Sequence, residues 1–320
     1  MVSARVAASV RLAILCGPTA VGKTAIGVAL AERLDAEIVA ADSRTIYRGM
    51  DIGTAKPTPE QRQRVPHHLI DVAEPDETFT LADYQRLARD ALRDIHGRGR
   101  LPLLVGGTGL YIRAIVDDLT IPEVTPDRAL RAALEAGERV HGPGHLHGRL
   151  AALDPVAAAH IHPHNIRRLV RALEVTLLTG RPISSQQRHG AAPGAVTVIG
   201  LMMARPDLYE CIDARIDGQL ASGLVEETRR LLARGIPVEA PSMQGLGYKE
   251  IAGWLQGECS YDEAIRRLAR NTRRYVKRQL TWFRRDPRII WIDLSDGSPA
   301  VAVQRVHAIM DAELSRQRRS

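Results

Sequence analysis

The sequence predicts an α/β fold in which a parallel β-sheet is flanked by helices. Short apolar runs alternate with longer segments of helical periodicity along the first third of the chain, which is the pattern of βαβ winding. The first apolar run, Leu12–Leu15, leads into a glycine-containing loop at 17–24 and then into a helical segment whose apolar face includes Ile26, Leu30 and Leu34. A strand, a loop and a helix in this order are typical of α/β proteins that bind phosphate groups.

The loop matches the pattern G-x-x-x-x-G-K-[ST], in which backbone N–H groups face a polyphosphate. Its residues are Gly17, Pro18, Thr19, Ala20, Val21, Gly22, Lys23 and Thr24. Lys23 would lie between phosphate oxygens, and the Thr24 hydroxyl would ligate Mg²⁺. The positive end of the following helix favours the same anion. We therefore predict a phosphate loop in a P-loop NTPase-like sheet, although the loop alone does not identify the phosphate donor.

The composition is that of a globular protein with nucleic acid or another polyanion as a favoured partner. The chain has 320 residues, 45% of them hydrophobic, which is enough for one large domain or two smaller ones. Its formal charge is +7, and its three cysteines are too scattered for a disulfide framework. No apolar run approaches the roughly 20 residues that span a bilayer. Because removal of a signal peptide would destroy the loop, we expect a cytoplasmic protein that is not membrane-bound.

A carboxylate follows the second predicted strand, Ala36–Ala41. The strand ends at Asp42-Ser43-Arg44, and ligands of open α/β sheets bind at such strand ends. Asp42 would thus face the phosphate loop from the next strand along the chain. It is either a Mg²⁺-binding or helix-capping residue, or a general base. The glycine-punctuated segment Tyr47–Pro57 that follows is too irregular for a plain helix.

Three more elements complete the first half of the sheet. We expect a short strand at 66–72, a helix capped by Thr80 over 81–95, and a buried strand at 101–105. The last strand runs into Gly106-Gly107-Thr108-Gly109 and a helix at 110–115. Many phosphate-loop NTPases carry a Walker-B aspartate at such a strand end. Small residues here indicate room for the close approach of a bulky substrate.

The texture changes between about Pro122 and Pro193, where strand signals disappear and Arg, His and Ala recur with helical spacing. Arg131 belongs to one basic helix, and Arg167 and Arg168 belong to another. The histidines lack the spacing of a metal site, so we expect none there. We predict a helical insertion domain at 122–194, and a catalytic core formed by 1–121 and 195–320.

The sheet resumes at Ala195–Met203, and a helix is predicted from about Leu208 to Ala233. Arg215 lies about two turns into it. A turn at 245–250 leads into helix, and the segment 264–288 combines one apolar stripe with arginines and lysines on its other faces, typical of a helix that presents cations to a polyanion. A last strand at 288–292 and a fraying basic helix end the chain.

By these motifs the chain resembles the tRNA dimethylallyltransferase (tRNA isopentenyltransferase) family over nearly its whole length. The matching stretches are GPTAVGKT (17–24), ADSRTIYRGMDIGTAKP (41–57), PHHLID (66–71), LLVGGTGLYIRA (103–114), RRLVRALEV (167–175), GLGYKE (245–250) and TRRYVKRQLTWFRRD (272–286). The chain lacks the C-terminal zinc finger of eukaryotic members, so we expect the bacterial type.

The resemblance implies transfer of a dimethylallyl group from dimethylallyl diphosphate to N6 of the adenine at position 37 of tRNA, with release of diphosphate. It assigns Asp42 as general base, Thr19 and Lys23 as diphosphate contacts, Thr24 as the Mg²⁺ contact and Arg215 as the arginine that steadies the leaving diphosphate. The implied tRNA contacts, on the anticodon stem-loop, are Asp42, Ser43, Arg44, Thr45, Thr108, Arg131, His164, Asn165, Ile166, Arg167 and Arg168. A monomer without an obligate protein partner is the family default.

Two local departures bear on tRNA recognition. The family more often has Gln where Thr45 stands, and the run His164–Arg168 is looser than the usual Gln/Arg-rich form. Three alternatives account for part of the sequence: a phosphate-loop kinase for a small metabolite, a nucleic-acid-binding module with a regulatory nucleotide site, and an enzyme that prenylates free adenine nucleotides. The basic insertion and the basic helix at 264–288 speak against the kinase, and the basic insertion also speaks against the enzyme for free nucleotides. Asp42, at a strand end that faces the phosphate loop, speaks against the binding module.

Overall fold

The protein forms two compact units in a computed structural model that describes residues 11–122, 124–186, 190, 194–295 and 299–317. The first unit comprises Met1–Val116 and Ala192–Ser320 and contains the sheet. The second comprises Asp117–Ala191 and, where described, its regular elements are helices. Each unit has its own apolar core, as expected for a structure that buries hydrophobic side chains separately in each part.

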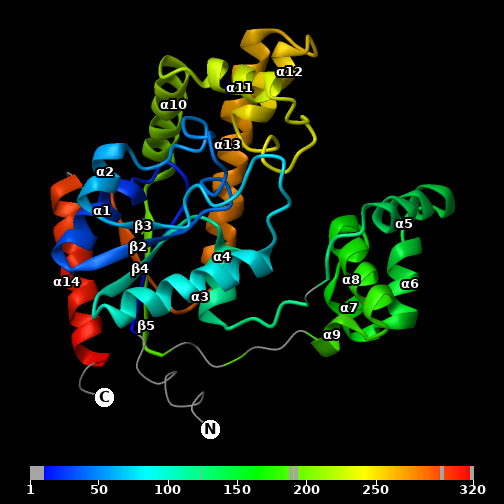
Figure 1. Cartoon of the computed structure of the whole chain (residues 1–320), viewed down its shortest axis with the longest axis horizontal. Coiled ribbons are helices and arrows are strands. Elements are labelled where there is room, and N and C mark those ends of the chain that lie inside the picture. Colours follow the sequence, from blue (N-terminus) through cyan, green and yellow to red (C-terminus); the bar gives the residue numbers. More distant parts are fainter. Residues whose placement is uncertain (1–10, 123, 187–189, 191–193, 296–298, 318–320) are drawn as a thin grey trace. The chain divides into compact units, whose positions relative to one another are not determined.

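All strands of the six-stranded sheet are parallel, which confirms the predicted α/β class, and their order is β3-β2-β4-β1-β5-β6 (Figure 1). The strands are β1 (Leu12–Cys16), β2 (Ala36–Ala41), β3 (His67–His68), β4 (Leu101–Gly106), β5 (Val196–Met202) and β6 (Ile289–Asp293). β4 pairs with both β1 and β2, so the phosphate loop after β1 and Asp42 after β2 are separated by one strand. The residues at the end of β4 therefore lie between them.

Helices cover both faces of the sheet because alternate side chains of each strand point to opposite sides. In β1, Ala13 and Leu15 join the core on the side of α1 and α14, whereas Leu12 and Ile14 join the core under α3 and α4 (Figure 1). The helices of this unit are α1 (Lys23–Arg33), α2 (Pro59–Arg64), α3 (Leu81–Gly97), α4 (Gly109–Val116), α10 (Arg205–Ala221), α11 (Leu224–Ala233), α12 (Tyr248–Leu255), α13 (Tyr261–Phe283) and α14 (Pro299–Gln317).

The second unit packs its helices around a small leucine-rich core. The helices are α5 (Arg128–His141), α6 (His145–Leu153), α7 (Pro155–His160), α8 (Ile166–Thr179) and α9 (Ile183–Gln186). Glu174 of α8 is fully buried in this unit. Its carboxylate accepts two hydrogen bonds of 2.7 Å from Arg131 of α5 and one of 2.7 Å from Arg171. The carboxylate therefore ties α5 to α8.

Two predicted elements are wrong in extent because the backbone turns left-handed inside them. The helix expected over 208–233 is two helices, since Gly223 has φ 99° and begins α11. The strand expected at 66–72 shortens to β3, because Leu69 and Asp71 have φ values of 63° and 58°.

Two helices lie near the C-terminal end of the chain. α13 begins earlier than predicted, where the Ser260 hydroxyl accepts a hydrogen bond from the Glu263 N–H and caps the helix. α14 packs firmly in its middle, where Val306 and Met310 are fully buried in the core beside α1, and the last residues, 318–320, lie outside the described residues.

Candidate active site

The phosphate loop lies between the buried end of β1 and the first turn of α1. Gly17 has φ 147°, and a Cβ there would lie 2.6 Å from the Leu201 carbonyl oxygen, so only glycine fits. Gly22 has φ 91° and precedes the first helical residue, Lys23. The Lys23 Nζ donates a hydrogen bond of 2.6 Å to the carbonyl oxygen of Pro18 within the same loop. The loop thus fixes the Lys23 side chain at the N-terminus of α1.

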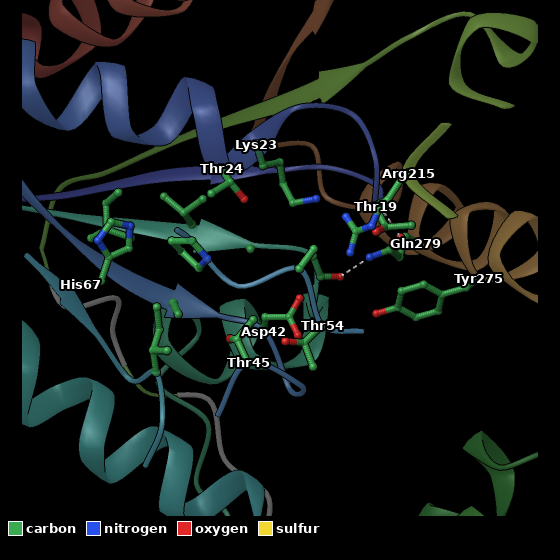
Figure 2. A pocket seen from close by; sticks show the side chains of 18 residues that line it. Thr19, Lys23, Thr24, Asp42, Thr45, Thr54, His67, Arg215, Tyr275 and Gln279 are labelled. Atoms are coloured by element: carbon green, nitrogen blue, oxygen red, sulfur yellow. Dashed lines mark hydrogen bonds between the residues drawn. The ribbon is translucent and has the colours of Figure 1, made fainter. Parts of the chain in front are cut away.

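One cavity of the first unit, with about 700 Å³ of empty space that includes its opening to solvent, brings the main predicted residues together (Figure 2). Lys23 and Asp42 point into it from opposite sides (Figure 2), and Arg215 of α10 and Thr19 also line it. The lining residues are Thr19, Lys23, Thr24, Ile38, Ala40, Asp42, Thr45, Thr54, Ala55, Pro57, His67, Ile70, Val105, Gly106, Gly107, Arg215, Tyr275 and Gln279. The cavity therefore has a cationic side, an acidic side and an apolar stretch.

The apolar stretch follows from the strand register. Ile38 and Ala40 alternate along β2 and share one face of the sheet, and Asp42, directly after the strand, lines the same cavity. Ala40 pairs with Val105 of β4, which lines the same cavity. An apolar group attached to a bound phosphate could thus pack against Ile38, Ala40 and Val105.

Burial and charge set the electrostatics of the cavity. Burial lowers the pKa of Lys23 to about 8, with Asp42 opposing this shift and Arg215 adding to it. Burial also lowers the pKa of Arg215, again opposed by Asp42. Two cations and one carboxylate therefore interact across the cavity, and the energetic cost of burying the cations favours an anionic ligand between them.

The segment after β2 is anchored to the end of β4. The Ser43 N–H donates to the Thr108 hydroxyl at 3.1 Å, and the Thr108 N–H donates to the Ala41 carbonyl oxygen at 3.1 Å. The Asp42 Oδ1 accepts a hydrogen bond of 2.8 Å from the Arg44 N–H, which fixes the carboxylate at the strand end. Thr45 is 7% exposed, and within the described chain its hydroxyl finds no hydrogen-bond partner although it lines the cavity.

The remaining predicted tRNA contacts lie in the second unit. Arg131 is engaged with Glu174, and the Asn165 side chain caps α8 by accepting from the Arg168 N–H at 3.4 Å. Ile166 packs against the unit's core, whereas His164, Arg167 and Arg168 are exposed. Beside Glu174, the Arg131 side chain remains 37% exposed, and the role of all these residues as tRNA contacts stays a prediction.

Gly106 and Gly107, at the end of β4, line the cavity, and together with Gly109 they are also required by the packing of the protein itself. A Cβ on Gly107 would lie 2.5 Å from the Gln279 Nε2, and a Cβ on Gly109 would lie 2.2 Å from the Trp282 ring. A Cβ on Gly106 would lie 2.0 Å from the Ala41 carbonyl oxygen. The positions that a Cβ would take at these glycines are therefore occupied by α13 and β2 of the protein itself.

Sequence reasoning missed several cavity residues, above all Gln279 and Tyr275 of α13. Burial raises the pKa of Tyr275 to about 12, and the Asp42 charge adds to this shift, so its phenol remains a hydrogen-bond donor at neutral pH. Gln279 is only 6% exposed and stands in the buried stripe between Val276 and Phe283. A polar residue inside an apolar stripe was the available signal.

A metal ion would have to bind largely through the substrate. Among the described residues, no group of three or more His, Cys, Asp or Glu side chains could hold a metal ion. Mg²⁺ usually takes one or two protein oxygens together with substrate phosphates and water. The Thr24 hydroxyl in the cavity fits that mode.

In the described part of the chain, no helix is long and apolar enough to cross a bilayer.

Comparisons with known proteins agree on one family. Residues 45–286 match the family model described as IPP transferase. A tRNA dimethylallyltransferase of Thermomicrobium roseum is 50% identical over 281 residues, 88% of this chain and 85% of that protein. One from Halalkalibacterium halodurans is 45% identical over 307 residues, 95% of this chain and 98% of that protein.

Solved structures agree with these sequence matches. The full-length tRNA isopentenylpyrophosphate transferase of Bacillus halodurans has a TM-score of 0.74 and 43% identity, covering 97% of this chain and 99% of that one. A eukaryotic dimethylallyltransferase acting on tRNA has a TM-score of 0.81 and 26% identity, covering 96% and 80%. The resemblance in the motifs is thereby confirmed, and the chain belongs to the tRNA dimethylallyltransferase family of prenyltransferases.

Proposed function

We propose that this chain transfers a dimethylallyl group from dimethylallyl diphosphate to N6 of the adenine at position 37 of tRNA, forming N6-dimethylallyladenine and releasing diphosphate. The observation that carries this proposal is the shared cavity, in which Asp42 faces Lys23 and Arg215. The family to which the chain belongs supports the reaction type. A kinase would leave the apolar stretch beside the phosphate loop without a purpose.

The cationic side of the cavity suits a departing diphosphate. As the allylic C–O bond breaks, negative charge grows on the diphosphate, and positive charge grows on the allylic carbon. Lys23, Arg215 and the loop N–H groups after Thr19 would stabilise the first charge. Bound Mg²⁺, with Thr24 as its protein contact, would neutralise part of the same charge.

The acidic side suits the incoming amine. The exocyclic amine of adenine is a poor nucleophile, so a base must accept its proton as the C–N bond forms. Asp42 is held for this task by its hydrogen bond from the Arg44 N–H. The Tyr275 phenol, protonated at neutral pH, lines the same cavity.

The tRNA would be bound through its anticodon stem-loop, whose unpaired bases can be splayed out at modest cost. Ser43, Arg44, Thr45 and Thr108 surround the strand end that carries Asp42. Arg131 and the run 164–168 are the proposed contacts in the second unit. The net charge of +7 supports a polyanionic partner. We also propose a cytoplasmic monomer without an obligate protein partner.

The direct test is to incubate the protein with labelled dimethylallyl diphosphate, Mg²⁺ and unmodified tRNA. We expect label on the tRNA and release of diphosphate. Parallel reactions with AMP in place of tRNA, and with labelled ATP in place of the isoprenoid, test the alternatives. Transfer to AMP alone, or phosphoryl transfer from ATP to a small acceptor, would overturn the proposal.

Replacing Asp42 with Asn separates the base from its structural role. The amide oxygen can still accept the Arg44 N–H but cannot take a proton, so turnover should fall by about 10²–10⁴-fold. Affinity for tRNA, measured by filter binding, should change little. A loss of tRNA affinity as large as the loss of turnover would contradict the assignment of Asp42 as base.

A further inference from the structure

Gln279 joins three segments that are far apart in the sequence. Its Oε1 accepts a hydrogen bond of 2.9 Å from the Thr19 N–H, and its Nε2 donates one of 2.9 Å to the Gly107 carbonyl oxygen (Figure 2). Thr19 belongs to the phosphate loop, Gly107 follows β4, and Gln279 belongs to α13. Both ends of the buried amide are therefore satisfied by backbone groups at the cavity wall.

The peptide unit that Gln279 contacts also holds Lys23. The Thr19 N–H and the Pro18 carbonyl belong to the same planar peptide group. Gln279 binds the N–H side of this group, and the Lys23 Nζ binds its carbonyl side at 2.6 Å. A rotation of this peptide would break both hydrogen bonds together, so the orientation of the peptide determines where the Lys23 ammonium stands.

The packing around Gln279 leaves its amide little freedom. A Cβ on Gly107 would come within 2.5 Å of the Gln279 Nε2, and the Trp282 ring fills the space at Gly109 one turn further along α13. α13 is thus seated against the glycines after β4 by two of its own side chains. Beyond this contact, the helix exposes Arg274, Lys277 and Arg278, which form no ion pair with a described carboxylate.

We propose that Gln279 is a positioning residue for the diphosphate: it fixes the Pro18–Thr19 peptide and thereby places the Lys23 ammonium. It acts through the loop and is not itself a catalytic group. Its position also connects the cationic helix α13 to the anion site through one side chain. The activity readouts below rest on the proposed prenyl transfer, whereas the binding of inorganic diphosphate does not.

The test compares Gln279→Met with a matched control on the same helix. Methionine has a similar length but neither accepts from Thr19 nor donates to Gly107. Thr272→Val is the control, because among the described residues the buried Thr272 hydroxyl bonds only the Leu268 carbonyl of its own helix. Inorganic diphosphate binding with Mg²⁺ is measured by calorimetry, tRNA binding by filter binding, and folding by thermal unfolding.

We expect Gln279→Met to weaken diphosphate binding about tenfold and to raise the KM for dimethylallyl diphosphate similarly, as for the loss of one well-placed hydrogen bond. Affinity for tRNA should stay within about twofold, and the control should match the wild type. Unchanged diphosphate affinity in a folded variant would overturn the inference. If the wild-type protein shows no prenyl transfer but Gln279→Met still weakens diphosphate binding, the proposed function is refuted and the inference stands.

A second variant, Gln279→Glu, keeps the inference testable if the methionine variant does not fold. The introduced carboxylate, when ionised, would place a negative charge beside the diphosphate, whereas its protonated form is nearly isosteric with the native amide. We expect the diphosphate affinity of this variant to recover toward the wild-type value as the pH falls, by more than the wild type itself changes. A pH profile parallel to that of the wild type would contradict the position assigned to this side chain.

Discussion

At the scale of single residues, the Thr45 hydroxyl is one of three buried side-chain groups without a hydrogen-bond partner in the described structure, the others being on Tyr84 and Arg273. It lines the cavity, is 7% exposed, and within the described residues its oxygen has no hydrogen-bond partner. An unsatisfied buried polar group costs about 1–3 kcal/mol of stability. We therefore infer that a bound ligand forms the missing hydrogen bond. Thr45 lies three residues after Asp42. In the proposed complex, a polar edge of the bound adenine would face this hydroxyl.

Replacing Thr45 with Val tests this role, since valine has the same shape without the hydroxyl. We expect thermal stability to stay level or rise, because the unsatisfied group is removed. The kcat/KM for tRNA should fall by about tenfold, the loss of one hydrogen bond to the base. Steady-state kinetics with varied tRNA measures this value. A fall in stability with unchanged kcat/KM would instead mark Thr45 as a packing residue.

At the scale of elements, α8 begins with the cations that are best placed to reach a phosphate backbone. Arg167 and Arg168 are exposed in its first turn, whereas Arg131 and Arg171 are engaged with Glu174. The two pairs of arginines therefore have different roles. The first pair is free to bind a partner, and the second holds the helices of the insertion together.

Replacing Arg167 and Arg168 with Gln should weaken tRNA binding uniformly across sequences and flatten its salt dependence. Each lost phosphate contact lowers the slope of log K against log salt by about 0.7–0.9. Titrations at several salt concentrations measure this slope. Arg33→Gln, an exposed arginine in the last turn of α1, is the matched control and should leave the slope unchanged. An unaltered slope in the double variant would remove α8 from the interface.

The elements that a local pattern defines could be predicted, and those defined by distant contacts could not. The phosphate loop and Asp42 at a strand end follow from motif and strand position. By contrast, the loop at 47–57 is held by Glu227, whose carboxylate accepts the N–H groups of Asp51, Ile52 and Gly53 at 2.9–3.1 Å. Glu227 lies more than 170 residues away along the chain, so no spacing in the sequence reveals the contact.

The same limit applies to α13. Its apolar stripe and its cations are visible in the sequence, and they predict a helix with one buried face. The partner of Gln279 is Thr19, 260 residues earlier, and the glycines that admit the side chain follow another strand. Periodicity identifies the buried face but does not say which backbone group a polar residue on that face will bind.

For the whole molecule, several buried or paired carboxylates set the response to acid. Hydrogen bonds and ion pairs outweigh burial and lower the pKa values of Glu37 and Asp71 in the first unit and of Asp154 in the second. For Glu174 burial opposes ionisation, but the arginines lower its pKa to about 2. Each group binds fewer protons in the folded than in the unfolded state over the acid range, so stability falls as the pH falls.

Glu174 allows this whole-molecule dependence to be tested with one substitution. Its folded pKa of about 2 is depressed, so its contribution is complete above the unfolded value and is lost as the pH falls toward 2. Glu174→Gln should therefore reduce the free energy of unfolding by about 3 kcal/mol at neutral pH, and by progressively less from about pH 5 downward. Denaturant titrations between pH 7 and about 3 measure the difference. Glu210→Gln, an exposed residue on α10, should show no such convergence, and a gap between wild type and Glu174→Gln that stayed constant with pH would show that the carboxylate is not held ionised by Arg131 and Arg171.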